Sequence, residues 1–134
     1  MENTKTKGEK QTEWDYISVY TRADAIRDGI LCDVSEMARE VGFRFPVALT
    51  ANVYARYVEV PNNVIGQDRQ GRLWDILWMC RAEINRCIDN RDELMFSLVV
   101  RNNDRAVKPV LLKSVCSSGD DGEPVITIML PGED

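Results

Sequence analysis

Residues 71–88 (GRLWDILWMCRAEINRCI) constrain the fold more than any other stretch of the chain. Apolar side chains recur there at the spacing of one face of an α-helix. Trp74 and Trp78 lie one turn apart beside that face, and the remaining polar strip is narrow, consisting of Arg72, Asp75, Glu83 and Arg86. A helix with so little polar surface is normally buried over most of its circumference. We therefore predict that residues 71–88 form the core helix and that both tryptophans belong to the core.

The same tryptophans have a second interpretation. Trp and Arg dominate the strongest contacts of protein interfaces, and Arg81 follows Trp78 by one helical turn. If this side of the helix faces solvent, Trp74, Trp78 and Arg81 would form an exposed hot spot for a partner.

Short helices are expected before the core helix, and strands after it. The predicted helices cover residues 23–28, 36–41 and 51–60. Residues suited to N-capping precede these helices and the core helix, namely Thr21, Ser35, Thr50 and Asp68. Apolar runs separated by turn residues predict strands at 94–101, 107–116 and 125–130.

This order of elements predicts an α+β fold. N-terminal short helices and one long buried helix would pack on a C-terminal three-stranded antiparallel meander. Residues 1–13 are polar and lack large apolar groups, so we expect a disordered tail there. Residues 14–20 suit a short strand, and residues 14–134 would form a single α+β domain.

The sequence lacks the residues that several kinds of catalytic and metal-binding sites normally use. The 134-residue chain has no histidine, which removes the commonest general base and the commonest metal ligand. No phosphate-binding loop is found, and the four cysteines have no metal-binding spacing. We expect the cysteines to be reduced, buried, small apolar residues. We therefore predict no catalytic residues, no metal site, no cofactor and no enzymatic activity.

Charge and hydropathy limit the location and the partners. The net charge of −5 argues against direct nucleic-acid binding. No apolar run has the length of a membrane span, and the lysines near the N-terminus are not followed by the apolar core of a secretory signal. We expect a cytoplasmic protein. The last residues carry acids without any base, and the candidate partner-binding residues are Asp120, Asp121, Glu123, Glu133 and Asp134.

Three strings give the chain a family resemblance. Residues 19–50, the GRLWDILWM string at 71–79 and the GDDGEPVITIMLPGED string at 119–134 resemble an uncharacterised family of small bacterial proteins. Such proteins are encoded on conjugative plasmids and other mobile elements. The resemblance implies no catalytic residues, but it implies a genetic setting in which small acidic proteins inhibit host complexes.

Three hypotheses follow from the sequence. The first is a small acidic binding protein of a mobile genetic element that inhibits a host defence or nucleic-acid-processing complex. The second is a small-molecule-binding protein or an enzyme without histidine, with a pocket between the central helix and the sheet. The third is a structural or regulatory protein that associates with itself through an edge strand. The identity of the partner and the oligomeric state stay open.

Overall fold

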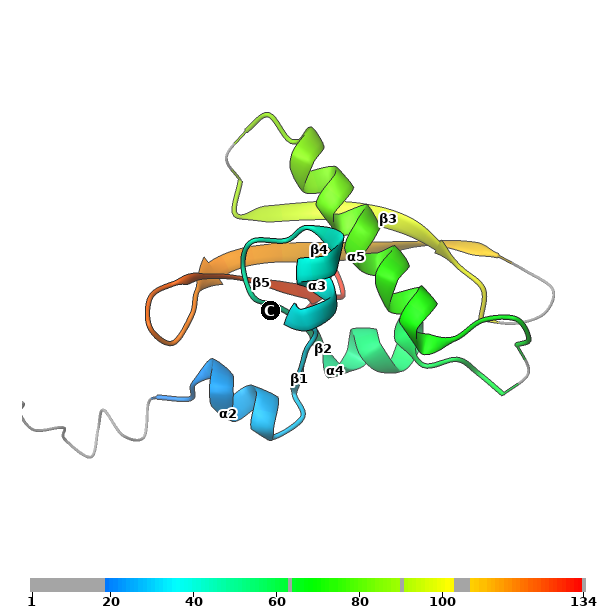
Figure 1. The fold of residues 1–134 in the computed structure, drawn as a ribbon, viewed down its shortest axis with the longest axis horizontal. Coiled ribbons are helices and arrows are strands. Elements are labelled where there is room, and N and C mark those ends of the chain that lie inside the picture. The colour runs from blue at the N-terminus through cyan, green and yellow to red at the C-terminus, as the bar shows by residue number, and fades with distance from the viewer. Residues whose placement is uncertain (1–18, 63, 90, 103–106, 134) are drawn as a thin grey trace, which may run out of the picture.

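A computed structural model of the chain describes residues 19–62, 64–89, 91–102 and 107–133. Its helices and strands form an α+β fold in which helices pack against a five-stranded mixed sheet (Figure 1). The α+β class is therefore confirmed. The predicted tail at 1–13 and residues 14–18 lie outside the described residues, and residues 19 and 20 are not in a strand.

The sheet is larger than the predicted meander. Strands β3 (Glu93–Val100), β4 (Lys108–Ser118) and β5 (Pro124–Met129) are antiparallel neighbours, as expected. The sheet continues beyond β5, because β2 (Val47–Thr50) pairs with β5 in parallel and β1 (Leu31–Asp33) pairs with β2. The predicted three-stranded sheet is thus wrong in extent. The strand order is β1–β2–β5–β4–β3, which places β5 in the centre.

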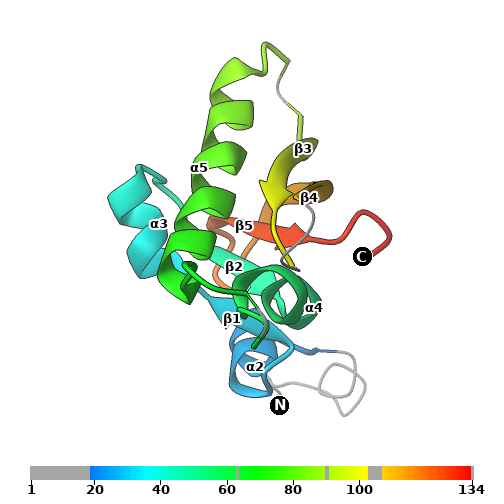
Figure 2. The same ribbon diagram turned by 90° about the vertical axis from the view of Figure 1, so that its right-hand side faces the viewer.

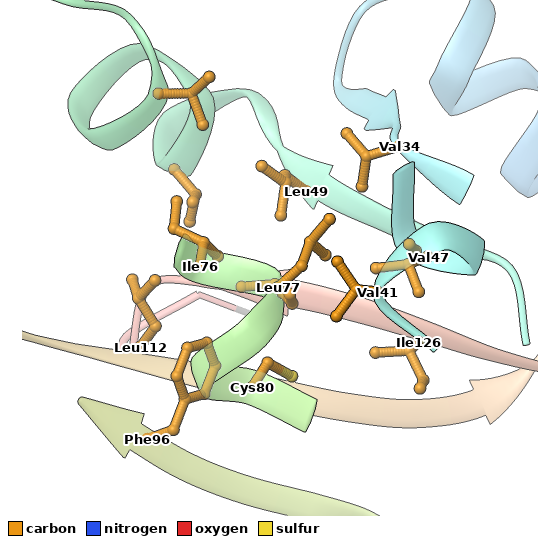
Figure 3. Close-up of a cluster of buried hydrophobic side chains, with 14 of the residues drawn as sticks. Val34, Val41, Val47, Leu49, Ile76, Leu77, Cys80, Phe96, Leu112 and Ile126 are labelled. Carbon is orange, nitrogen blue, oxygen red and sulfur yellow. The ribbon is translucent and has the colours of Figure 1, made fainter. Parts of the chain in front are cut away.

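The predicted core helix is α5 (Arg69–Arg86). The carboxylate of Asp68 accepts a hydrogen bond of 2.6 Å from the N–H of Gly71, so the predicted N-cap is confirmed. Ile76, Leu77 and Cys80 are fully buried and pack in a cluster with side chains of β2, β3, β4 and β5 (Figure 3). α5 therefore covers the face of the sheet where the core lies, as Figure 2 shows.

Two predictions about the sides of α5 are wrong. Trp74 is 37% exposed and Trp78 is 51% exposed, so neither belongs to the core. Arg72, which was expected in the solvent-facing strip, is buried. The reason is that the described residues cover α5 on one side only, and that side is centred on Ile76, Leu77 and Cys80. The tryptophans lie outside the covered side of the helix, where its periodicity of 3.6 residues per turn places them.

The short helices hold the ends of the sheet. α2 (Arg22–Arg27) begins with a capping box formed by Thr21 and Asp24, so the prediction of Thr21 as the N-cap is confirmed. α3 (Ser35–Val41) has Val34 at its N-cap, so the prediction of Ser35 as the cap is wrong. The hydroxyl of Ser35 instead accepts a hydrogen bond from the N–H of Val47, which joins α3 to β2. The predicted helix at 51–60 is a short α4 (Ala51–Val53) that continues as the π-helix η1 (Tyr54–Val58).

The two faces of the sheet are covered unequally. Ile126 and Ile128 point into the core under α5. Thr127, which alternates with them, accepts a hydrogen bond of 2.7 Å from Arg22 of α2. α2 therefore lies on the second face of the sheet, next to β5. Further along the second face, three large apolar side chains of β3 and β4 are exposed: Met95, Val99 and Leu111.

Candidate protein-binding surface

The tryptophan pair of α5 is the one stacked aromatic pair found in the described chain. The rings of Trp74 and Trp78 are stacked, with centroids 6.5 Å apart and planes inclined by 17°. Their spacing of four residues places them on neighbouring turns of one helix side. The stack gives the pair a fixed orientation at the surface and keeps a large apolar area in contact with water. The structure thus agrees with the second interpretation of these residues as exposed side chains.

Arg81 is the next charged residue of α5 after the tryptophan pair, and its side chain reaches toward α3. It follows Trp78 by one turn, and its side chain crosses the backbone at Gly42, directly after α3. A Cβ atom at Gly42 would stand only 2.6 Å from Nε of Arg81. Gly42 also has a φ of 125°, which side-chain-bearing residues rarely adopt. The absence of a side chain at Gly42 therefore leaves room for the guanidinium of Arg81 against the backbone that follows α3.

A cleft of about 380 Å³ opens between the start of α5 and the end of β3. Trp74 and Asp75 contribute to its wall from α5, and Leu98 to Val100 contribute from β3. Its other lining residues are Tyr57, Gly66, Gln67, Asp68, Gly71, Arg72 and Arg101. The volume lies within the usual range of small-molecule pockets. Because Trp74 lines the cleft, the surface next to the tryptophan pair is concave.

Arg72 lines this cleft but its donors are used within the protein. Nη1 donates to the carbonyl of Glu59 and to Oδ1 of Asn102, both at 3.0 Å, and Nε donates to Oε1 of Gln67 at 2.8 Å. Nη2 donates to the carbonyl of Arg101. Burial lowers the pKa of the guanidinium. Arg72 is thus a structural clamp. The sequence contains a signal for its burial, because Arg72 shares the four-residue spacing of Ile76 and Cys80.

Two of the candidate acidic residues are engaged within the fold. The carboxylate of Asp120 accepts hydrogen bonds from the N–H groups of Arg22 and Ala23, at 2.7 and 3.0 Å, and so binds the first turn of α2. The carboxylate of Glu133 accepts from the hydroxyl of Thr50 and the amide of Asn52, both at 2.8 Å. These carboxylates hold distant segments together, which the sequence pattern did not reveal.

The acidic residues do not form one patch. The turn at 119–123 precedes β5 and Glu133 follows it, so the two groups lie at opposite ends of that strand. Asp121 and Glu123 are exposed, and Glu123 accepts a hydrogen bond of 3.0 Å from the N–H of Asp121. Asp134 lies outside the described residues. Asp121 and Glu123 therefore stay the more accessible acidic candidates for contact with a partner.

With this geometry in view, sequence comparison places the chain in a known group. A family profile described as "Family of unknown function (DUF6573)" matches residues 11–134. The chain belongs to the DUF6573 family. Comparison with curated proteins and with solved structures gives no match.

The cysteines of this DUF6573 chain are free thiols. Cys80 is buried, whereas Cys32, Cys87 and Cys116 are only partly buried, so the expectation that all four are buried is wrong for three of them. Burial raises the pKa of Cys80 to about 12 and also raises the pKa values of Cys32 and Cys116. The thiols of Cys32, Cys80 and Cys116 are therefore protonated at neutral pH and are poor nucleophiles.

The described part of this DUF6573 chain shows neither a cluster of metal ligands nor a membrane-spanning helix. Within the described ranges, no three side chains of Cys, Asp or Glu come together as metal ligands would. Among the helices that the structure describes, none combines the length and apolar character needed to cross a bilayer.

Proposed function

We propose that this chain is a binding protein that contacts another protein through Trp74, Trp78 and Arg81. The observation that carries the proposal is the stacked tryptophan pair on the uncovered side of α5. Exposure of two adjacent tryptophans to water has a free-energy cost that a partner removes by covering them. The partner side of such a contact would be an apolar or aromatic pocket with an acceptor for Arg81.

The setting of this function is also a proposal. The resemblance of the GRLWDILWM and GDDGEPVITIMLPGED strings to proteins of conjugative plasmids supports a role in a mobile genetic element. We propose that the partner is a host defence or nucleic-acid-processing complex of a bacterial cell, and that binding inhibits it in the cytoplasm. Asp121 and Glu123 would add contacts to basic residues of that complex.

The cleft beside Trp74 supports a second candidate function, the binding of a small molecule. Its size is suitable. Of the two arginines that line the cleft, Arg72 already donates its hydrogen bonds to protein acceptors. The carboxylate of Asp68 already caps α5. Neither Arg81 nor a cysteine lines it. The charged groups left for a ligand are Asp75 and Arg101, so we favour the protein-binding function.

The decisive experiment compares tryptophan variants in partner capture. The wild-type chain is used as bait in a lysate of a bacterial host, and the retained protein is then purified and its affinity is measured by calorimetry. We expect Trp78→Ala to weaken binding by about 30-fold or more, as truncation of a hot-spot tryptophan does. Circular dichroism should show an unchanged fold, because the side chain of Trp78 is half exposed.

Matched variants separate the two surfaces. Ile65→Ala removes a side chain that is 86% exposed and lies outside the tryptophan side of α5, so it should leave the affinity unchanged. In the double variant Asp121→Asn, Glu123→Gln, the affinity for the partner should depend less on salt concentration than in the wild type. The affinity itself should fall only modestly. If Trp78→Ala and Ile65→Ala bind the purified partner equally well, the tryptophan surface is not the contact.

A further inference from the structure

Strand β3 lies at the outer edge of the sheet, with β4 as its only strand neighbour among the described residues (Figure 1). It is eight residues long, and Glu93, at its first position, is its only charged residue. The other edge strand, β1, has three residues and ends in the charged Asp33. Natural proteins shorten or charge an edge strand to prevent pairing with another chain. β1 has both protections, whereas β3 has neither over its length.

The hydrogen bonds show which backbone groups of β3 face outward. The N–H of Cys116 donates to the carbonyl of Asp92 at 2.7 Å, which makes these two residues a hydrogen-bonded pair of the β3–β4 ladder. Such pairs recur at every second residue of an antiparallel ladder. Even-numbered residues of β3 therefore bond to β4, and Met95, Ser97 and Val99 direct their N–H and C=O groups to the open edge. The carbonyl of Arg101, the next odd residue, accordingly bonds to Arg72 and not to β4.

The odd-numbered side chains form a self-complementary series. Glu93, Met95, Ser97 and Val99 point to the second face of the sheet, and Arg101 follows β3 at the next odd position, so the order along the edge is acid, apolar, small, apolar, base. An identical strand running antiparallel around Ser97 would place Glu93 opposite Arg101 and Met95 opposite Val99. Ser97 would lie opposite its own copy. Opposite charges and apolar side chains in facing positions both stabilise a strand pair.

We propose that β3 pairs with β3 of a second copy of this chain, antiparallel and centred on Ser97, to form a two-fold symmetric dimer. The outward N–H and C=O groups of Met95, Ser97 and Val99 then bond across the dimer axis. The sheets of both copies become continuous, and the exposed Met95, Val99 and Leu111 of each copy form one apolar surface next to the axis. The axis is perpendicular to the sheet, so both α5 helices lie on the same face.

The test is the mass of the full chain in solution, measured by light scattering with size exclusion. The wild type should have twice the mass of one chain. Ser97→Lys places two like charges opposite each other at the axis, and Ser97→Pro removes an outward N–H without breaking a bond to β4. Both should have the mass of one chain with the circular dichroism of the wild type. Ser97→Thr keeps the N–H and suits a strand, so it should stay dimeric.

A cross-link tests the register. In the proposed dimer the two Ser97 residues are a hydrogen-bonded pair with Cα atoms about 5.5 Å apart, a separation that a disulfide spans. Ser97→Cys should therefore give a covalent dimer on mild oxidation, whereas Ser118→Cys, at the exposed end of β4, should not. A wild type with the mass of one chain, or a Ser97→Pro variant that folds and stays dimeric, would overturn the proposal. So would an equal yield of cross-link from the two cysteine variants.

Discussion

At the scale of single residues, Glu133 shows how one carboxylate near the end of the chain stabilises the fold. Partial burial would raise its pKa, but the hydrogen bonds from the N–H of Leu130 and from Asn52 and Thr50 outweigh that effect and lower it. These contacts join the turn after β5 to the end of β2 and the start of α4. Glu133 therefore closes one end of the sheet, in addition to any contact with a partner.

The lowered pKa of Glu133 predicts a pH dependence of stability. The ionised form is favoured in the folded chain, so its contribution is fully present above the pKa of an unfolded Glu, about 4.3, and is lost as the pH falls through the lower folded pKa. Glu133→Gln should reduce the free energy of unfolding at pH 7 by about 1 kcal/mol and should reduce the loss of stability below pH 5. Urea unfolding at several pH values measures both effects.

A control for this prediction is Asp121→Asn. Its side chain is exposed and accepts no hydrogen bond among those found in the described residues. Its pH profile of unfolding should match that of the wild type. A Glu133→Gln variant with the wild-type profile would show that the network around Glu133 does not contribute.

At the scale of elements, α5 shows what its sequence can and cannot predict. Its existence and its start at Asp68 depend on local signals, namely periodic apolar residues and a capping carboxylate, and both were predicted. The side of α5 that is covered depends on the neighbouring sheet and on α3. The sequence pattern therefore did not decide whether Trp74 and Trp78 are exposed. A tryptophan on an amphipathic helix is more often in the core, and the sequence alone does not show that nothing packs there.

Arg72 links α5 to two other elements, and its removal tests that link. Its guanidinium bonds to the carbonyl of Glu59, just after η1, and to Arg101 and Asn102, just after β3. Arg72→Met keeps the apolar part of the side chain but leaves several partly buried acceptors without a donor. We expect the free energy of unfolding to fall by about 3 kcal/mol. Denaturant titration measures it.

The matched control is Arg69→Met, three residues earlier on an exposed position of the same helix. It should change the stability by less than about 0.5 kcal/mol. Arg72→Lys should recover only part of the loss, because an ammonium group does not reproduce the planar fork of the guanidinium. Equal stability of Arg72→Met and Arg69→Met would contradict the clamp.

At the scale of the whole molecule, the sheet joins the two halves of the chain. The meander of β3, β4 and β5 was predictable because its turns are short and its pairs are neighbours in sequence. The pairing of Val47 with Ile126 was not predictable, because no local sequence signal indicates a contact between residues so far apart in the chain. The intramolecular bonds of the acidic candidates were unpredictable for the same reason, since Asp120 and Glu133 bond to Arg22 and Thr50 across the fold.

This topology predicts one cooperative unfolding transition for the described fold. β5 bonds to β2 on one side and to β4 on the other, so neither half retains a complete core without it. Far-ultraviolet circular dichroism, which reports all elements, and tryptophan fluorescence, to which α5 contributes two of the three tryptophans, should give the same urea midpoint. Separate midpoints would indicate that β1 and β2 unfold independently of the meander.

The central position of β5 also has a consequence during synthesis. β5 follows every other strand of the described chain, so the ribosome delivers it last. Until Met129 has emerged, the β1–β2 pair and the β3–β4 hairpin have no strand between them. The apolar faces of those pairs and of α5 then stay accessible to chaperones and to other nascent chains. The growing polypeptide must therefore be protected from aggregation through most of its translation.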